Sequence, residues 1–392
     1  MNTSICTAFN HMRLINMFFH LPQVQAITME YEDNYDDYED KKYLDMLNNS
    51  ENASYQSCDG GLVQHCFSAN VNKFAAITPY FYYINFLLSY LGNWLVLFII
   101  VKLEKVNSVT NIFLINLVTS NILFASSFPF LAKYHSSEWI FGTVLCKLVS
   151  SAHLIGFYSS ILFLTLMTFD RYLAVVHAVS AAKSRKRAYA IGASLIVWFI
   201  SVLASLNELV FKGVWKHSKH GLMCEETGYH ADVVEQWNLV SYYMQFLLFF
   251  LLPLFMVMYC YTCITVRIMS TRMREKWRSV KLIFIIMITF FVCWTPYNIV
   301  ILLKAIQIST TDDANRKCDQ VEALNYALYV TRNIAFLYCC ISPMFYSFVG
   351  KRLQSHFRKL LLKNMPCLAR HFRPASLSSK STAQRTSHTN DL

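Results

Sequence analysis

The chain has 392 residues, of which 55% are hydrophobic and only 15% are charged. A soluble protein usually carries roughly a quarter charged residues, so this composition argues against a soluble globular fold. In a membrane protein, a net charge of +11 reports basic cytoplasmic loops more often than nucleic-acid binding. We therefore expect no nucleic-acid partner.

Seven apolar stretches follow one another, and each can cross the roughly 30 Å of hydrocarbon in a bilayer. They cover residues 75–101, 109–132, 148–169, 188–207, 237–266, 282–303 and 323–350. Because the bilayer offers no water to the backbone, each stretch is predicted to be a helix. The predicted fold class is all-α, a seven-transmembrane helix bundle.

Lysine and arginine gather after the third stretch, between the fifth and sixth, and after the seventh. Basic loops stay in the cytoplasm, so we expect a multi-pass plasma-membrane protein with its N-terminus outside. The predicted parts are an extracellular acidic tail (1–65), the seven-helix domain (66–349), a lipid-facing amphipathic helix (350–363) and a cytoplasmic tail (364–392). Asn48 and Asn52 begin sequons in the outer tail, where N-glycosylation occurs.

Residues 1–28 allow two interpretations. They fit a weak signal peptide that ends in small residues, or an extension ahead of a true start at Met29. The sequence leaves open whether the chain starts at Met1, Met12 or Met29.

Each predicted helix except the second contains a short motif at a characteristic depth. They are Gly92-Asn93, Asp170-Arg171-Tyr172, Trp198, Pro253 with Tyr261, Cys293-Trp294-Thr295-Pro296 and Pro343-Met344-Phe345-Tyr346. In this order they resemble rhodopsin-like G-protein-coupled receptors. The resemblance implies that Arg171 pairs with Asp170 at rest and turns toward a G protein and Tyr261 on activation. It also implies that Trp294 and Pro296 form the hinge.

Segments 127–129, 139–142, 170–179 and 338–343 resemble chemokine receptors in particular, and the resemblance runs from residue 66 to about 363. Segments 107–113, 280–284 and 331–336 are similar to the branch that binds the C-class chemokine. Arg332 carries most of this narrower likeness, because most receptors of the CC and CXC classes have a Glu at that depth.

The resemblance implies a small basic chemokine as the ligand, which meets an acidic outer tail first. Tyr31, Tyr35 and Tyr38 stand among six acidic residues, a setting in which tyrosines become sulfated. Such charges steer the encounter and set specificity. The alternative interpretation is a disordered acidic tail without a partner.

The ligand's N-terminus would then enter the helical bundle. The resemblance places Tyr82, His153, Tyr297, Arg332 and Phe336 around it, and we add Glu208 at the outer end of the fourth helix. An ionisable group within a span is costly unless it meets a wet cavity or a partner. Arg332 is therefore a functional group or the structural partner of Glu208 or Glu322, and His153 is a ligand contact or a satisfied core histidine.

Two outer disulfides are implied by the same resemblance, Cys146 with Cys224 and Cys66 with Cys318. Cys6 and Cys58 are left over, as free thiols or as a bridge of their own.

Two positions depart from the rhodopsin-like pattern. Asn121 replaces the sodium-binding Asp of the second helix, and Ser342 replaces the Asn before the seventh-helix proline. A hard cation prefers carboxylate oxygens, so we expect weak or no sodium dependence, with Ser160 hydrogen-bonded to Asn121 or Ser342. The favoured function is leukocyte chemotaxis through an inhibitory-class G protein and arrestin. The alternative is an atypical, scavenging receptor with little G-protein signalling.

The cytoplasmic end offers Cys367 as a palmitoylation site or an unmodified thiol, followed by Ser and Thr residues that kinases would mark for arrestin. No catalytic set, metal-ligand motif or phosphate loop is recognisable, so we expect neither an enzyme nor a bound cofactor or metal. The sequence leaves homo- or hetero-dimer formation open.

Overall fold

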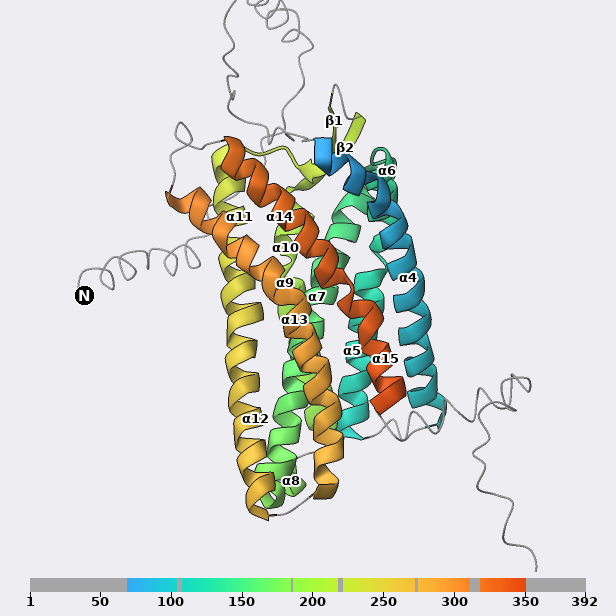
Figure 1. The fold of residues 1–392 in the computed structure, drawn as a ribbon, viewed down its shortest axis with the longest axis vertical. Helices are drawn as coiled ribbons and strands as arrows, with labels where there is room; N and C mark the ends of the chain where they lie inside the picture. Colours follow the sequence, from blue (N-terminus) through green and yellow to red (C-terminus); the bar gives the residue numbers. More distant parts are fainter. Residues whose placement is uncertain are drawn as a thin grey trace, which may run out of the picture. The chain divides into compact units, whose positions relative to one another are not determined.

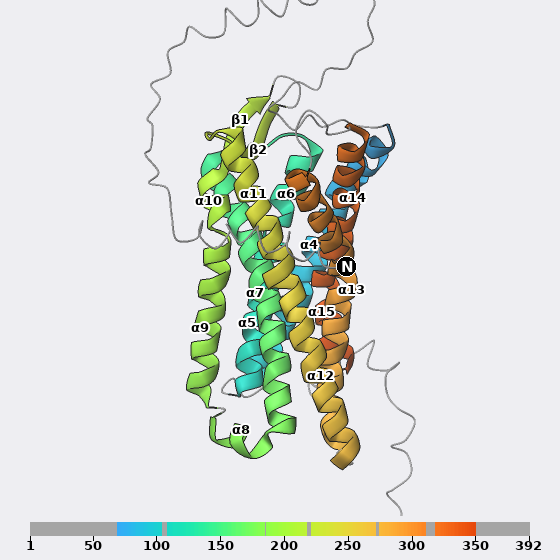
Figure 2. The same ribbon diagram turned by 90° about the vertical axis from the view of Figure 1, so that its left-hand side faces the viewer.

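The chain divides into two compact units, Met1–Asp59 and Gly60–Leu392. The computed structural model describes residues 69–103, 108–184, 186–217, 221–271, 274–310 and 318–349, some of them by their backbone alone. All of these residues belong to the second unit. Within it, long helices run side by side as a bundle, and a β-hairpin lies at one end (Figures 1 and 2).

The seven predicted membrane helices are confirmed, four as single helices and three as divided ones. The single helices are α4 (Ala69–Leu103), α7 (Gly142–Val176), α9 (Arg187–Ala204) and α13 (Arg274–Thr310). The second span joins α5 (Val109–Ala125) to α6 (Phe128–Ser136). The fifth joins α11 (Ala231–Phe246), the π turn η1 (Leu247–Leu251) and α12 (Leu252–Thr271). The seventh joins α14 (Cys318–Phe336) to α15 (Tyr338–Val349).

In the part of the chain that the structure describes, six helices are long and apolar enough to cross a membrane. The seventh predicted span, formed by α14 and α15, is not among these six. The described residues also contain two short helices that the sequence did not predict, α8 (Ala178–Ser184) and α10 (Leu206–Phe211).

Prolines explain two of the divisions. A proline ring collides with the carbonyl group four residues earlier in a regular helix and donates no backbone hydrogen bond. For Pro129 that residue is Ala125, where α5 ends, and the Ser127 hydroxyl donates to the Phe124 carbonyl at 2.7 Å. For Pro253 it is Phe249, which lies in η1, where the wider π turn accommodates the ring.

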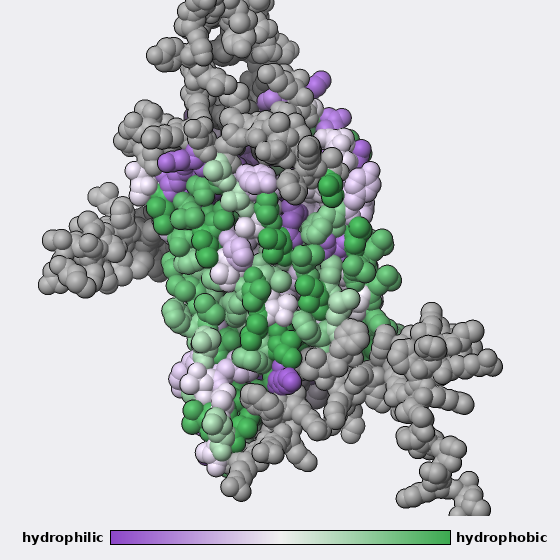
Figure 3. Space-filling model, viewed as in Figure 1, coloured by the Kyte–Doolittle hydropathy of each residue, from purple (hydrophilic) through white to green (hydrophobic). Residues whose placement is uncertain are grey.

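The bundle is apolar both inside and outside. Its interior is strongly aromatic, with Phe113, Phe124, Phe128, Phe163, Phe290 and Phe336 among the largest fully buried side chains. On the outside of α9, Leu195 is 65% exposed and Phe199 is 69% exposed. Figure 3 shows hydrophobic side chains covering the middle of the visible face. Such a surface is stable in lipid, as expected of a multi-pass plasma-membrane protein.

The described residues also contain a two-stranded sheet, which adds to the all-α fold predicted from the sequence. Strand β1 (Lys212–His217) pairs antiparallel with β2 (Gly221–Glu226), and Val214 lies opposite Cys224. Cys224 forms a disulfide with Cys146 near the start of α7, which confirms the predicted bridge. The disulfide fastens the hairpin to the outer end of the bundle.

Gly156 lets α7 lie close to the backbone of α5. A Cβ atom at this position would lie 2.6 Å from the Phe124 nitrogen. We expect Gly156→Ala to lower the free energy of unfolding by about 1–3 kcal/mol, because neither helix backbone can move aside. Thermal unfolding of the purified protein measures this loss. Gly192→Ala is the matched control, since its Cβ meets no atom within 4 Å. Equal melting temperatures for the two variants would contradict this packing.

Candidate ligand-binding site

Arg332 extends from the C-terminal part of α14 toward α6 and α4. Its Nη2 atom lies 3.5 Å from Nε2 of His135, and its guanidinium lies 5.9 Å from the ring centre of Tyr329. The Nε atom is buried and has no hydrogen-bond partner among the described residues. The predicted pocket arginine therefore lies among aromatic and imidazole groups.

Aromatic rings form an apolar layer beside Arg332 and bring three of the predicted ligand-binding residues together. Tyr82 is fully buried, with its ring 5.8 Å from Phe336 and 5.4 Å from His135. His153 lies 5.1 Å from Phe336 and shares a 2.8 Å hydrogen bond with the Ser127 hydroxyl. This internal partner fits a core histidine as well as a ligand contact.

Tyr297 connects this layer to the predicted hinge. Its ring meets Trp294 edge-on at 5.7 Å, and Trp294 in turn stacks on Phe157 of α7 at 4.1 Å. Phe124 lies 6.0 Å from Trp294 and 5.2 Å from Phe336, so ring contacts run from the Arg332 layer to the hinge.

Glu208 lies in a different charge cluster. Its main charged neighbours are Lys212 and Glu226 of the hairpin, and the Lys212 ammonium reaches Oε1 of Glu226 at 2.6 Å. Burial raises the pKa of Glu208 despite the nearby lysine. Burial opposes the charge of Lys212, but the two glutamates outweigh it and raise the pKa of Lys212. Burial likewise opposes the charge of Glu226, but Lys212 outweighs it and lowers the pKa of that carboxyl.

The hairpin is also fastened to the loop before α7. The Leu222 N–H donates to Oε2 of Glu138 at 2.8 Å, and the Trp139 N–H donates to the Leu222 carbonyl at 2.8 Å. The Lys147 ammonium donates to the carbonyls of Leu209 and Val210 at 2.8 and 3.1 Å. With the disulfide, these bonds hold β2 and α10 across the outer end of α7.

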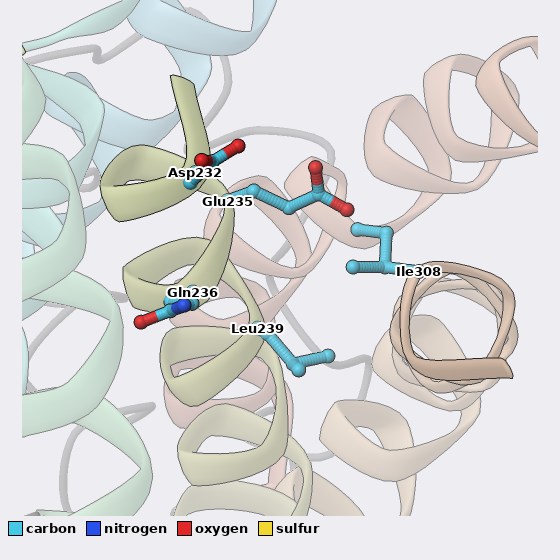
Figure 4. Close-up of a pocket in the computed structure, with 5 residues that line it drawn as sticks. All are labelled: Asp232, Glu235, Gln236, Leu239 and Ile308. Carbon is cyan, nitrogen blue, oxygen red and sulfur yellow. The ribbon is translucent and has the colours of Figure 1, made fainter. Parts of the chain in front are cut away.

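A cavity of about 280 Å³ opens between the outer ends of α11 and α13. Figure 4 shows Asp232, Glu235, Gln236 and Leu239 on α11, with the side chains of Glu235 and Leu239 directed toward Ile308 of α13. None of the predicted ligand-binding residues lines it. The two carboxylates make the cavity an acidic extension of the outer surface.

At the inner end, Arg171 donates from Nη2 to the Thr110 hydroxyl at the start of α5. Asp170 is buried, and the Tyr172 hydroxyl hydrogen-bonds with Nε2 of His177 at 3.0 Å. Tyr261 of α12 packs edge-on against Phe284 of α13 at 4.8 Å. These contacts join α5 to α7 and α12 to α13 at the inner end of the bundle.

Asn121 forms a neutral polar network at the predicted sodium position. Its amide Nδ2 donates to Oδ1 of Asn93 at 3.4 Å and to the Ser342 hydroxyl at 3.3 Å. The Ser160 hydroxyl donates instead to the Phe157 carbonyl of its own helix at 2.9 Å. Asn121 is thus bonded to Asn93 and Ser342, and the predicted hydrogen bond from Ser160 is replaced by one within its own helix.

His135 and Tyr329 contact Arg332 but were not predicted as site residues from the sequence. The second apolar stretch ended at Ala132 in the sequence, whereas α6 continues beyond the proline to Ser136. The kink changes the direction of the helix, so periodicity carried through from α5 does not show which side chains face Arg332. Tyr329 precedes Arg332 by three residues, a spacing that places both on one helix face and could have identified it.

Several predicted sites lie outside the described residues or side chains. They are Tyr31, Tyr35, Tyr38, Asn48, Asn52, Cys66 and Cys367, the side chains of Cys318, Glu322 and Tyr346, and the helix at 350–363.

The helix bundle, the fastened hairpin and the inner Asp170-Arg171-Tyr172 motif define a seven-transmembrane receptor. The pattern of the family described as "7 transmembrane receptor (rhodopsin family)" matches residues 92–346. The chain is 35% identical over 324 residues to C-C chemokine receptor type 3 of Cavia porcellus, covering 82% of this chain and 89% of that one. It is 36% identical over 308 residues to C-C chemokine receptor type 8 of Macaca mulatta, covering 78% and 83%.

C-C chemokine receptor type 1 of Homo sapiens is 35% identical over 305 residues, covering 77% of this chain and 84% of that one. The chain belongs to the chemokine receptors of the rhodopsin family.

Proposed function

We propose that the protein is a signalling receptor for the C-class chemokine lymphotactin, coupled to an inhibitory-class G protein and to arrestin. The observation that carries the ligand assignment is Arg332, a guanidinium in the seventh span surrounded by Tyr82, Tyr329 and His135. A charge within a span is costly and marks a functional group by default.

The outer surface supports a basic ligand. Asp232 and Glu235 line the cavity between α11 and α13, and the sequence places six acids around Tyr31, Tyr35 and Tyr38. Sulfation of these tyrosines would add negative charge for the arginines and lysines of a chemokine. The tail then captures the ligand, and the pocket receives its N-terminus.

The ring contacts suggest how binding changes the inner end. A ligand that displaces Phe336 or Tyr297 would shift Trp294 against Phe157, with which it stacks at 4.1 Å. Trp294 lies two residues before Pro296, where α13 lacks a backbone hydrogen bond and bends most readily. Bending would open the inner end and release Arg171 from Thr110 toward a G protein.

One observation favours a second function, an atypical receptor that binds and removes chemokines with little signalling. The Asn121–Ser342 hydrogen bond joins α5 directly to α15 and replaces a charged site with a neutral one. A permanent bond between these helices would favour one conformation of the bundle. The preserved Asp170-Arg171-Tyr172 motif supports the signalling function.

A chemokine panel on cells that express the full chain tests the proposal, with inhibition of cyclic AMP, arrestin recruitment and ligand uptake read in parallel. We expect both signals with the C-class chemokine. Arg171→Asn is the control, because it should abolish the cyclic AMP response and leave ligand binding intact. Uptake of a chemokine with neither signal would establish the scavenging function instead.

A further inference from the structure

We propose that Arg332, His135, Tyr82 and Tyr329 form an anion-binding subsite that takes a carboxylate from an acidic side chain in the ligand's N-terminal segment. This inference rests on the chemokine-receptor function proposed above and specifies the ligand chemistry that the pocket selects.

The first argument is the uncompensated charge of Arg332. A guanidinium stays protonated at any physiological pH, and a charge that is partly withdrawn from water is stabilised by an anionic partner. Within the part of the chain that the structure describes, no carboxylate forms an ion pair with Arg332, and its Nε has no hydrogen-bond partner. The His135 imidazole and the Tyr329 ring orient the guanidinium, and neither of them brings a negative charge to it.

The second argument is that the surrounding groups present donors. The Tyr82 side chain is fully buried near Arg332, and its O–H proton has no acceptor among the described residues. Arg332 can only donate, so its hydrogen bond to the Tyr82 oxygen leaves the phenol proton in need of an acceptor. A carboxylate accepts from both and matches the fork of an arginine with two oxygens.

The third argument excludes Glu208, the counter-charge suggested by the sequence. Its strongest charged neighbours are Lys212 and Glu226 at the hairpin, and Arg332 interacts mainly with Tyr82, Tyr297 and Tyr329. Phe128 and Phe336 stack at 5.1 Å beside Tyr82 and keep this side of the pocket apolar. An apolar wall strengthens the attraction between Arg332 and an entering carboxylate.

The test combines ligand and receptor substitutions. Each Asp or Glu before the first cysteine of lymphotactin is replaced in turn by Asn or Gln, and binding is measured on wild-type receptor and on Arg332→Gln. We expect one of these substitutions to weaken binding to wild type by about 10- to 100-fold, the range of a charge-assisted hydrogen bond. The same substitution should cost almost nothing on Arg332→Gln.

Lys304→Gln is the matched receptor control. Lys304 is also basic and lies on α13, but its ammonium already donates to Oδ1 of Asn325 at 3.2 Å. On this variant the ligand substitution should keep its full effect. Cell-surface staining checks that each variant folds. Arg332→Lys keeps the positive charge and should recover part of the binding that Arg332→Gln loses.

Charge reversal completes the design. A ligand in which the identified acid is Lys should bind Arg332→Glu better than wild type. If the ligand substitution weakens binding to Arg332→Gln by the same factor as binding to wild type, the two changes act independently. That result would overturn the subsite and leave the proposed receptor function in place. A wild-type receptor that answers no chemokine would overturn the proposed function and the subsite together.

Discussion

Replacing Cys146 and Cys224 together by alanine is expected to lower the free energy of unfolding by about 2–5 kcal/mol and to weaken chemokine binding by at least tenfold. The bridge joins residues 78 positions apart, and a loop of that length confines the unfolded chain strongly. It also holds β2 at the outer end of α7, so its loss frees the hairpin above the pocket.

The remaining contacts of the hairpin limit the damage. Leu222 keeps its two bonds to the loop at Glu138 and Trp139, and Lys147 still caps α10 through the carbonyls of Leu209 and Val210. We therefore expect a folded protein with a lower melting temperature rather than a failure to fold. Adding Glu138→Ala to the double variant should reduce stability further, because it removes the acceptor for the Leu222 N–H.

Tryptophan fluorescence of the purified receptor measures the melting temperature, and labelled chemokine measures the affinity. Cys263→Ser is the control, since Cys263 is a free, partly buried thiol on α12 and forms no bridge. A double variant that melts and binds like wild type would show that the hairpin needs no covalent anchor.

Physical patterns in the sequence account for the membrane helices but less well for their ends. Charge-free runs identify the spans because the hydrocarbon excludes charge, yet the third stretch began at Leu148 and α7 begins at Gly142. The reason is Lys147, which hydropathy places in water. In the structure its ammonium is bound by the carbonyls of Leu209 and Val210. Two backbone carbonyls therefore hold this charge at the start of the helix.

The hairpin and the surroundings of Arg332 depend on tertiary contacts. Residues 212–226 show no clear alternation of polar and apolar side chains, and their pairing is supported by the Cys146–Cys224 bridge and by Leu222. The resemblance pointed to Arg332, Tyr82 and Phe336, which the structure brings together. It did not indicate His135, because that residue follows the proline kink between α5 and α6.

Asn121→Asp is expected to make the receptor sodium-dependent, whereas the wild type should show weak or no dependence. Asn93 is held by its amide, which donates to the carbonyls of Ser89 at 2.8 Å and Cys339 at 3.3 Å, so its Oδ1 faces Asn121. An aspartate at 121 would set a carboxylate against that oxygen and lose both donated bonds. A sodium ion between the oxygens would remove the repulsion, because hard cations prefer oxygen ligands.

Melting temperatures in sodium chloride and choline chloride, at equal ionic strength, measure the effect. Sodium at ten times its dissociation constant would stabilise Asn121→Asp by about 1.4 kcal/mol. Asn121→Leu is the control: it loses the same hydrogen bonds without adding charge, so it should melt lower in both salts alike. A wild type stabilised by sodium as much as Asn121→Asp would contradict the neutral network. If Asn121→Asp instead gains both sodium dependence and a stronger cyclic AMP response, the Asn121–Ser342 bond restrains signalling and the scavenging function gains support.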